Sequence, residues 1–157
     1  MALLPAAARY SGTLYREAGH AIDGLHAAGA HSLIISGGYG VVLPAEPIGW
    51  YNQEYRNAMW PDALVPRCLS AYAEATRASS VVGLLSATTQ YARAFRAARW
   101  PVEIENVFLA CPEPKPGAMV KTPRAIGEAL VALSQDHRLR PGWKSSDGLA
   151  MQVAKLK

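Results

Sequence analysis

Apolar residues recur at helical spacing in four stretches of the chain. We expect amphipathic helices there, because apolar positions three or four residues apart share one helix face. The helices are predicted over residues 13–28, over residues 61–77, after a cap at Thr88 or Thr89, and from a cap at Thr122 to about residue 137. Three shorter apolar runs between the helices predict buried strands over residues 32–36, 80–86 and 102–110.

Helices and strands that alternate in this way are typical of an α/β fold, a three-layer arrangement in which helices cover both faces of a mostly parallel sheet. No internal repeat interrupts the pattern, so we expect one domain over residues 1–157, with a basic, weakly patterned tail from about residue 139. Prolines predict an ordered loop over residues 41–60, unless a short helix lies there, and a stiff loop over residues 111–117.

The composition is that of a soluble globular protein. Half of the 157 residues are hydrophobic and 18% are charged, which places the chain well away from disordered sequences. No window reaches the roughly 18 consecutive apolar residues that a membrane span needs, and no targeting segment is recognisable, so we expect a cytoplasmic protein. Cys68 and Cys111 lie far apart without CxxC spacing, which argues against structural zinc, and we expect neither a metal nor a cofactor.

The net charge of +4 is unevenly distributed along the chain. Residues 1–77 hold five basic and six acidic side chains, whereas residues 78–157 hold eleven basic and six acidic ones. An excess of cations suits a surface that binds phosphate groups, although similar asymmetry occurs in proteins that bind no nucleic acid. The candidates for contact with nucleic-acid phosphates are Arg93, Arg96, Arg99, Lys115, Lys121 and Arg124.

The best candidate for a ligand-binding segment is the glycine turn, residues 36–40, which follows the first predicted strand. In parallel sheets ligands bind beyond the carboxyl ends of the strands, and glycines there permit positive φ and close approach to a phosphate or a planar base. Ser86 and Thr88 lie at the same end of the second predicted strand. The aromatic faces available for stacking on a base are those of Tyr10, Tyr15, Trp50 and Tyr51. The predicted ligand-binding residues are Tyr10, Gly12, Ser36, Gly37, Gly38, Tyr39, Gly40, Tyr51, Ser86 and Thr88.

These features are also compatible with roles that involve no ligand. The glycine turn can be a simple chain reversal, because its spacing differs from GxGxxG and Val41-Val42-Leu43-Pro44 follows it instead of a helix. Ser86 and Thr88 can serve in helix capping alone. No Ser-His-Asp or Cys-His spacing is recognisable, so the sequence assigns no catalytic residue.

The order of motifs around the glycine turn resembles that of a known family. Tyr10-Ser11-Gly12 precedes a predicted helix, and Ile35-Ser36-Gly37-Gly38-Tyr39-Gly40-Val41 runs on to Pro44, Ile48 and Tyr51. This is similar to the YaaA family, whose pattern there is a strand, then Ser-Gly-x-Tyr-Gly-Val, a proline and a later tyrosine. Weaker similarity continues through Leu84-Leu85-Ser86-Ala87 and Ile104-Glu105-Asn106-Val107-Phe108, so the resemblance covers about residues 8–110.

The resemblance implies a cytoplasmic protein that protects against peroxide stress and binds DNA through a basic cleft. It supplies no catalytic mechanism. Members of the family begin with a strand that carries a serine and a lysine, which this sequence lacks, so we expect the first strand of the family's sheet to be absent. An open sheet edge of that kind would favour an oligomer in which another chain supplies a strand.

Three functional hypotheses follow. The first is a YaaA-like stress-response protein that binds nucleic acid through its basic face. The second is an enzyme that acts on a nucleotide or nucleoside, at the N-glycosidic bond or on the base, with the glycine turn holding the ligand. The third is a non-catalytic domain that completes its sheet with another chain.

Overall fold

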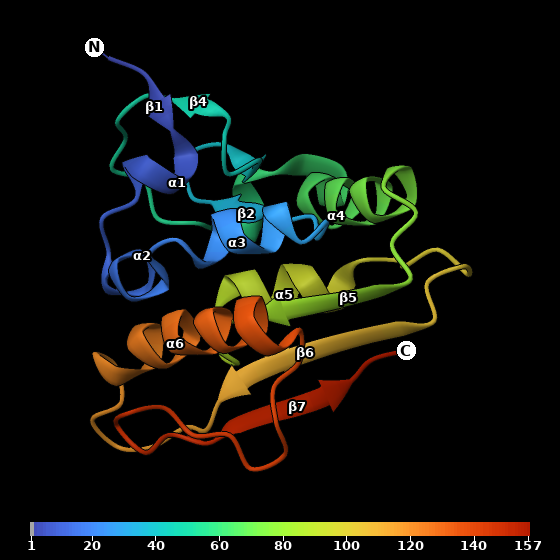
Figure 1. The fold of residues 1–157 in the computed structure, drawn as a ribbon. Coiled ribbons are helices and arrows are strands. Elements are labelled where there is room, and N and C mark those ends of the chain that lie inside the picture. Colours follow the sequence, from blue (N-terminus) through green and yellow to red (C-terminus); the bar gives the residue numbers. More distant parts are fainter. Residues whose placement is uncertain (1) are drawn as a thin grey trace.

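The computed structural model describes residues 2–157, and Figure 1 shows how their helices and strands are arranged. The helices are α1 (Ala6–Arg9), α2 (Thr13–Ala18), α3 (Ala21–Ala27), α4 (Leu64–Ala75), α5 (Gln90–Ala97) and α6 (Lys121–Asp136), with 3-10 turns η1 (Asn57–Met59) and η2 (Pro61–Ala63). The strands are β1 (Leu4–Pro5), β2 (Ile34–Ser36), β3 (Gly40–Val42), β4 (Pro47–Ile48), β5 (Ser80–Leu84), β6 (Asn106–Pro112) and β7 (Met151–Lys155). The predicted α/β class is confirmed.

The largest sheet has the strand order β5-β6-β7 and is mixed. β5 is parallel to β6, whereas β7 runs antiparallel to β6 along its other side. The prediction of a mostly parallel sheet is therefore wrong. The tail beyond residue 139 contributes β7, and the expected loop at 111–117 begins inside β6, where Pro112 pairs with Met151 at the strand end. Sequence analysis did not predict β7, because side chains on both of its faces are exposed and buried apolar positions therefore do not alternate with exposed polar ones.

The first predicted strand lies outside this sheet. β2 pairs antiparallel with β3, with Ser36 opposite Gly40, in a separate two-stranded sheet. The glycine turn is thus a hairpin turn, and it does not connect a parallel strand to a helix. Residues 41–60, predicted as a loop, contain β3, β4 and η1, and β4 pairs antiparallel with the unpredicted β1.

Some helix boundaries differ from prediction, at a glycine that interrupts a helix and at a residue predicted as an N-cap. The expected helix over residues 13–28 is two helices, because Gly19, at a φ of +48°, interrupts it between α2 and α3. Of the two candidate caps of α5, Thr89 is the actual one, since its hydroxyl accepts a hydrogen bond from the Ala92 N–H at 3.3 Å. The predicted cap at Thr122 is wrong, because α6 begins at Lys121 and has no side-chain cap.

The main core lies on one face of the β5-β6-β7 sheet. Val107 and Leu109 of β6 pack there with residues of α4 and α5, Phe95 among them. The β2-β3 hairpin joins the same core through Ile35 and Val41. α6 contacts β5 and β6 from the other face, and α2 and α3 pack on α6 (Figure 1). A second cluster, which links the hairpin to the N-terminal segment, consists of Ala6, Ile34, Val42 and Ile48.

Within residues 2–157, no helix combines the length and apolar character needed to span a bilayer.

Candidate ligand-binding site

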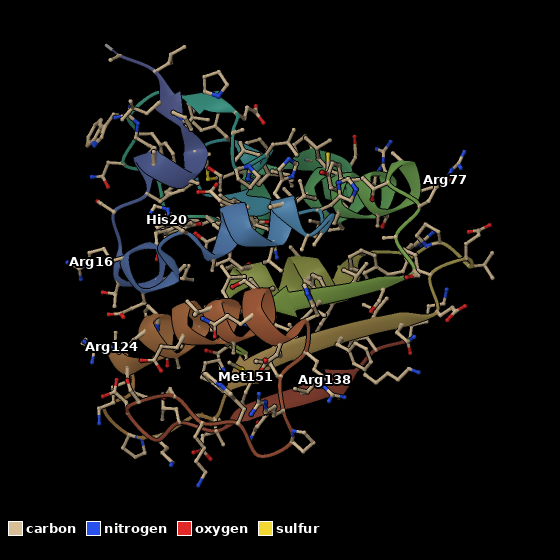
Figure 2. The ribbon with its side chains drawn as sticks, in the orientation of Figure 1. Arg16, His20, Arg77, Arg124, Arg138 and Met151 are labelled. Atoms are coloured by element: carbon tan, nitrogen blue, oxygen red, sulfur yellow. The ribbon has the colours of Figure 1, made fainter. Side chains whose placement is uncertain are left out.

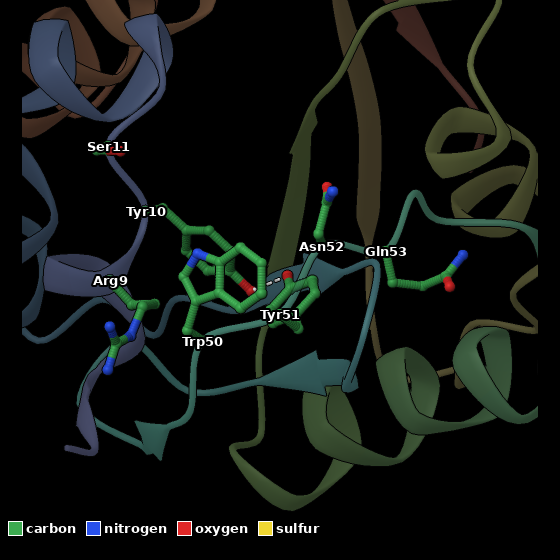
Figure 3. A pocket seen from close by; sticks show the side chains of 7 residues that line it. All are labelled: Arg9, Tyr10, Ser11, Trp50, Tyr51, Asn52 and Gln53. Carbon is green, nitrogen blue, oxygen red and sulfur yellow. Dashed lines mark hydrogen bonds between the residues drawn. The ribbon is translucent and has the colours of Figure 1, made fainter. Parts of the chain in front are cut away.

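A pocket of about 280 Å³ lies between the end of α1 and the loop that follows β4 (Figure 3). Its lining residues are Arg9, Tyr10, Ser11, Trp50, Tyr51, Asn52 and Gln53. This volume is at the lower end of the range of ligand pockets, roughly 300–1,000 Å³, so the pocket suits a small ligand. Sequence analysis singled out Tyr10 and Tyr51, but it missed Arg9, Ser11, Asn52 and Gln53 as site residues.

Three hydroxyl groups meet at this site. The Tyr10 hydroxyl donates to Ser36 Oγ at 2.8 Å and lies 2.7 Å from the Tyr51 hydroxyl, which is itself 2.8 Å from Ser36 Oγ. Each hydroxyl has one proton, so a closed ring forms when Ser36 donates to Tyr51 and Tyr51 donates to Tyr10. The backbone N–H of Tyr39 donates a further hydrogen bond to Ser36 Oγ at 3.2 Å. Ser36 is only 1% exposed, and the ring satisfies its hydroxyl inside the protein.

Tyr10 is protonated at neutral pH. Burial raises the pKa of Tyr10 well above its usual range, and the neighbouring Tyr51 and Tyr91 raise it further. Burial also raises the pKa of Tyr15, whose ring stacks on that of Tyr10 with centroids 4.9 Å apart. Tyr10 is therefore a hydrogen-bond donor at neutral pH and cannot act as a phenolate base.

The glycine turn supports the wall of the pocket without lining it. A Cβ atom at Gly37 would lie 2.0 Å from the carbonyl oxygen of Gln53, and one at Gly38 would lie 2.6 Å from Cδ2 of Tyr51. The loop of residues 49–55 thus crosses directly over the turn, and these two glycines are needed for close approach. Gly40 is the member of the turn with a positive φ, +75°.

The remaining predicted ligand-binding residues have other surroundings. The Tyr39 hydroxyl accepts a hydrogen bond from the Gly49 N–H at 3.0 Å, and its ring meets that of Tyr51 edge-on with centroids 5.4 Å apart. Gly12 precedes α2, and Ser86 and Thr88 lie between β5 and α5; none of the three lines the pocket. The structure therefore brings Tyr10, Ser36, Tyr39 and Tyr51 into contact, whereas Gly12, Ser86 and Thr88 are not among the residues that line the pocket.

The predicted phosphate-binding cations lie on elements that cover opposite faces of the largest sheet. Arg93, Arg96 and Arg99 lie on or just after α5 and are exposed. Lys115, Lys121 and Arg124 lie before or within α6, and of these Lys115 and Lys121 are exposed while Arg124 is half-buried. Arg124 (Figure 2) is ion-paired with Glu17 at 3.4 Å and with Asp147 at 3.3 Å. Lys115 is paired with Glu113 at 2.5 Å, which lowers the pKa of that carboxyl group. Two cations of the α6 group are thus already neutralised by carboxylates.

The polar groups of the pocket are suited to binding. Among the described residues that line it there is no histidine, carboxylate or thiol, and no cluster of His, Cys, Asp or Glu in residues 2–157 could hold a metal ion. Phenols, a hydroxyl group, amides and a guanidinium group remain, and these recognise a polar ligand by hydrogen bonding and charge.

Comparisons with protein-family models, curated proteins and solved structures find no match to this chain.

Proposed function

We propose that this protein binds a small molecule that contains a nucleobase, in the pocket between α1 and the loop after β4. The observation that carries the proposal is an exposed aromatic face beside two amide side chains. Trp50 lines the pocket and is 61% exposed, and the exposed Asn52 and Gln53 line it as well. A base stacks on such an indole face, while each amide offers the donor and acceptor that the edge of a base requires.

Binding is better supported than chemistry at the base or the N-glycosidic bond. General acid–base catalysis at neutral pH uses a group whose pKa lies near 7, and the raised pKa of Tyr10 is far from that value. The protons of the Tyr10 and Tyr51 hydroxyls are used within the ring, so these groups support the proposal as hydrogen-bond acceptors for the base or its sugar. An enzyme acting on a nucleotide or nucleoside would need its acid or base from outside the described lining.

The proposal is tested by thermal unfolding of the full chain with a panel of bases, nucleosides and nucleotides. A ligand at about 100 times its Kd should stabilise the protein by about 2.7 kcal/mol and raise Tm by several degrees. Trp50→Ala should abolish this shift. The control Val102→Ala, which truncates a residue that is 83% exposed and does not line the pocket, should retain it. A panel without any stabilising member, or a shift unchanged in Trp50→Ala, contradicts the proposal.

A second candidate function is association with nucleic acid, and the resemblance of the glycine turn to the YaaA family supports it. Arg93, Arg96 and Arg99 favour this candidate, because they are exposed at three-residue spacing and form no ion pair within residues 2–157. On this proposal the protein is a YaaA-like cytoplasmic protein that binds DNA under peroxide stress.

Salt dependence tests the second candidate. DNA binding should weaken steeply between about 50 and 200 mM salt, and replacement of the three arginines by glutamine should flatten that dependence. Absence of DNA binding by the full chain at about 50 mM salt would exclude this role. Measurement of mass in solution tests the related proposal that a sheet edge pairs with another chain.

A further inference from the structure

We infer that the ligand of this pocket carries an oxyanion which Arg9 binds, so that the site prefers a nucleoside monophosphate to the corresponding nucleoside. The inference rests on the proposed function, which leaves open whether the ligand is a base, a nucleoside or a nucleotide. The inference adds that the ligand is negatively charged, and it assigns recognition of that charge to Arg9.

Arg9 is held in place without being neutralised. It is the last residue of α1, and its Nη2 donates to the backbone oxygens of Ala2 at 2.5 Å and Ile48 at 3.4 Å. These carbonyl groups fix the guanidinium but carry no net charge. Arg9 forms no ion pair with a carboxylate in the described part of the chain, and its Nε is buried without a hydrogen-bond acceptor there.

The nearby carboxylates are engaged elsewhere. Glu46 accepts a hydrogen bond from the Leu43 N–H at 3.1 Å, and Glu54 faces Arg56 at 3.9 Å. The other described lining residues are tyrosines, a tryptophan, a serine and two amides. The Arg9 guanidinium is therefore the only group with a full positive charge among the described residues that line the pocket. An arginine fixed in such surroundings favours a planar or tetrahedral oxyanion, because its N–H groups form charge-assisted hydrogen bonds to carboxylate or phosphate oxygens.

The lining has two chemically different ends. In the view of Figure 3, Trp50 lies between the guanidinium of Arg9 and the hydroxyl group of Tyr51, which points toward that of Tyr10. Asn52 and Gln53 lie on the tyrosine side. A ligand that matches this arrangement has a planar, polar, uncharged part joined to an anionic part. A nucleoside monophosphate has both, whereas a nucleoside lacks the second.

Calorimetric titration of the full chain with nucleosides, their 5′-monophosphates, ribose 5-phosphate and inorganic phosphate tests the inference. We expect the monophosphate to bind at least about tenfold more tightly than the nucleoside, which is the effect of one hydrogen bond to a charged group. Arg9→Gln should remove that difference. Arg16→Gln is the matched control and should retain it, because Arg16 projects outward from α2 and does not line the pocket (Figure 2).

Since Arg9 also holds two backbone carbonyls, a measurement on the unaltered protein provides an independent arm. The second pKa of a phosphate monoester is about 6, so affinity for the monophosphate should rise between about pH 5 and pH 7 while affinity for the nucleoside stays constant.

The possible outcomes separate the inference from the proposed function. Equal affinity for nucleoside and monophosphate overturns the anion site and leaves base binding intact. If ribose 5-phosphate binds as tightly as the nucleotide and the nucleoside does not bind, the anion site stands and base recognition fails. If none of these compounds binds, both fail.

Discussion

Replacement of Gly38 by alanine perturbs the contact between the glycine turn and the ring of Tyr51, which lines the pocket. The new Cβ would lie 2.6 Å from Cδ2, 2.8 Å from Cγ and 3.0 Å from Cε2 of Tyr51, well inside van der Waals contact. The ring cannot simply move away, because its hydroxyl is held by Tyr10 and Ser36. Overpacking of this kind costs about 1–3 kcal/mol, and loss of a hydrogen bond about 1 kcal/mol more, so we expect Gly38→Ala to lower the free energy of unfolding by about 2–4 kcal/mol.

Urea unfolding measures this loss, and Gly24→Ala is the matched control. Gly24 lies inside α3, and the atom nearest to a new Cβ there is the Cβ of Ser134 at 3.8 Å, which is an ordinary van der Waals contact. Alanine should therefore stabilise the helix by about 0.5–1 kcal/mol. In the double variant with Tyr51→Ala the clash is relieved, so its effects should be less than additive. If Gly38→Ala unfolds at the same urea concentration as the unaltered protein, the loop does not cross the turn as described.

Three other predictions concern stability. Ser36→Ala breaks the hydroxyl ring and should lower the free energy of unfolding in urea by about 1–3 kcal/mol, whereas an unchanged value would show that the ring is not formed. Burial raises the pKa of Tyr55 to about 12, above its unfolded value near 10, so its contribution to stability is complete below pH 10 and is lost as the pH rises through 12. Tyr55→Phe should weaken that alkaline loss, and an identical pH dependence would contradict the assignment. Gly127→Ala places a Cβ 2.6 Å from the Leu14 carbonyl oxygen and should cost about 1–3 kcal/mol by forcing α2 from α6; calorimetric unfolding at an unchanged Tm would disprove their close packing.

The helices that pack on the largest sheet were the most predictable part of the fold. α5 shows why: Ala92, Ala94 and Phe95 are buried while Arg93 and Arg96 are exposed, so its sequence carries the contrast on which periodicity depends. β7 carries no such contrast. The hairpin of β2 and β3 was misassigned for a different reason, since a short apolar run does not reveal whether its neighbour is parallel or antiparallel.

The candidate site was predictable in its parts but not in its assembly. Tyr10, Ser36 and Tyr51 were selected individually, yet their hydroxyls meet across separations of 15 to 41 residues, which no local pattern encodes. Arg9 ends the four-residue helix α1, and Gln53 lies in the loop after β4. Neither segment is long enough to show periodicity, so sequence analysis had no basis for choosing them. Tryptophan at position 50, in a polar loop, was the signal that pointed closest to the pocket.

The measurement that tests base binding most directly is an NMR titration of the isotope-labelled full chain with nucleosides and nucleotides, followed at the indole and side-chain amide resonances. Binding in the proposed pocket predicts saturable shifts at the indole N–H of Trp50 and at the amides of Asn52 and Gln53. The indoles of Trp100 and Trp143, which do not line the pocket, should stay unchanged. Shifts at those two indoles with Trp50 unaffected, or no shift at any ligand concentration, would contradict it.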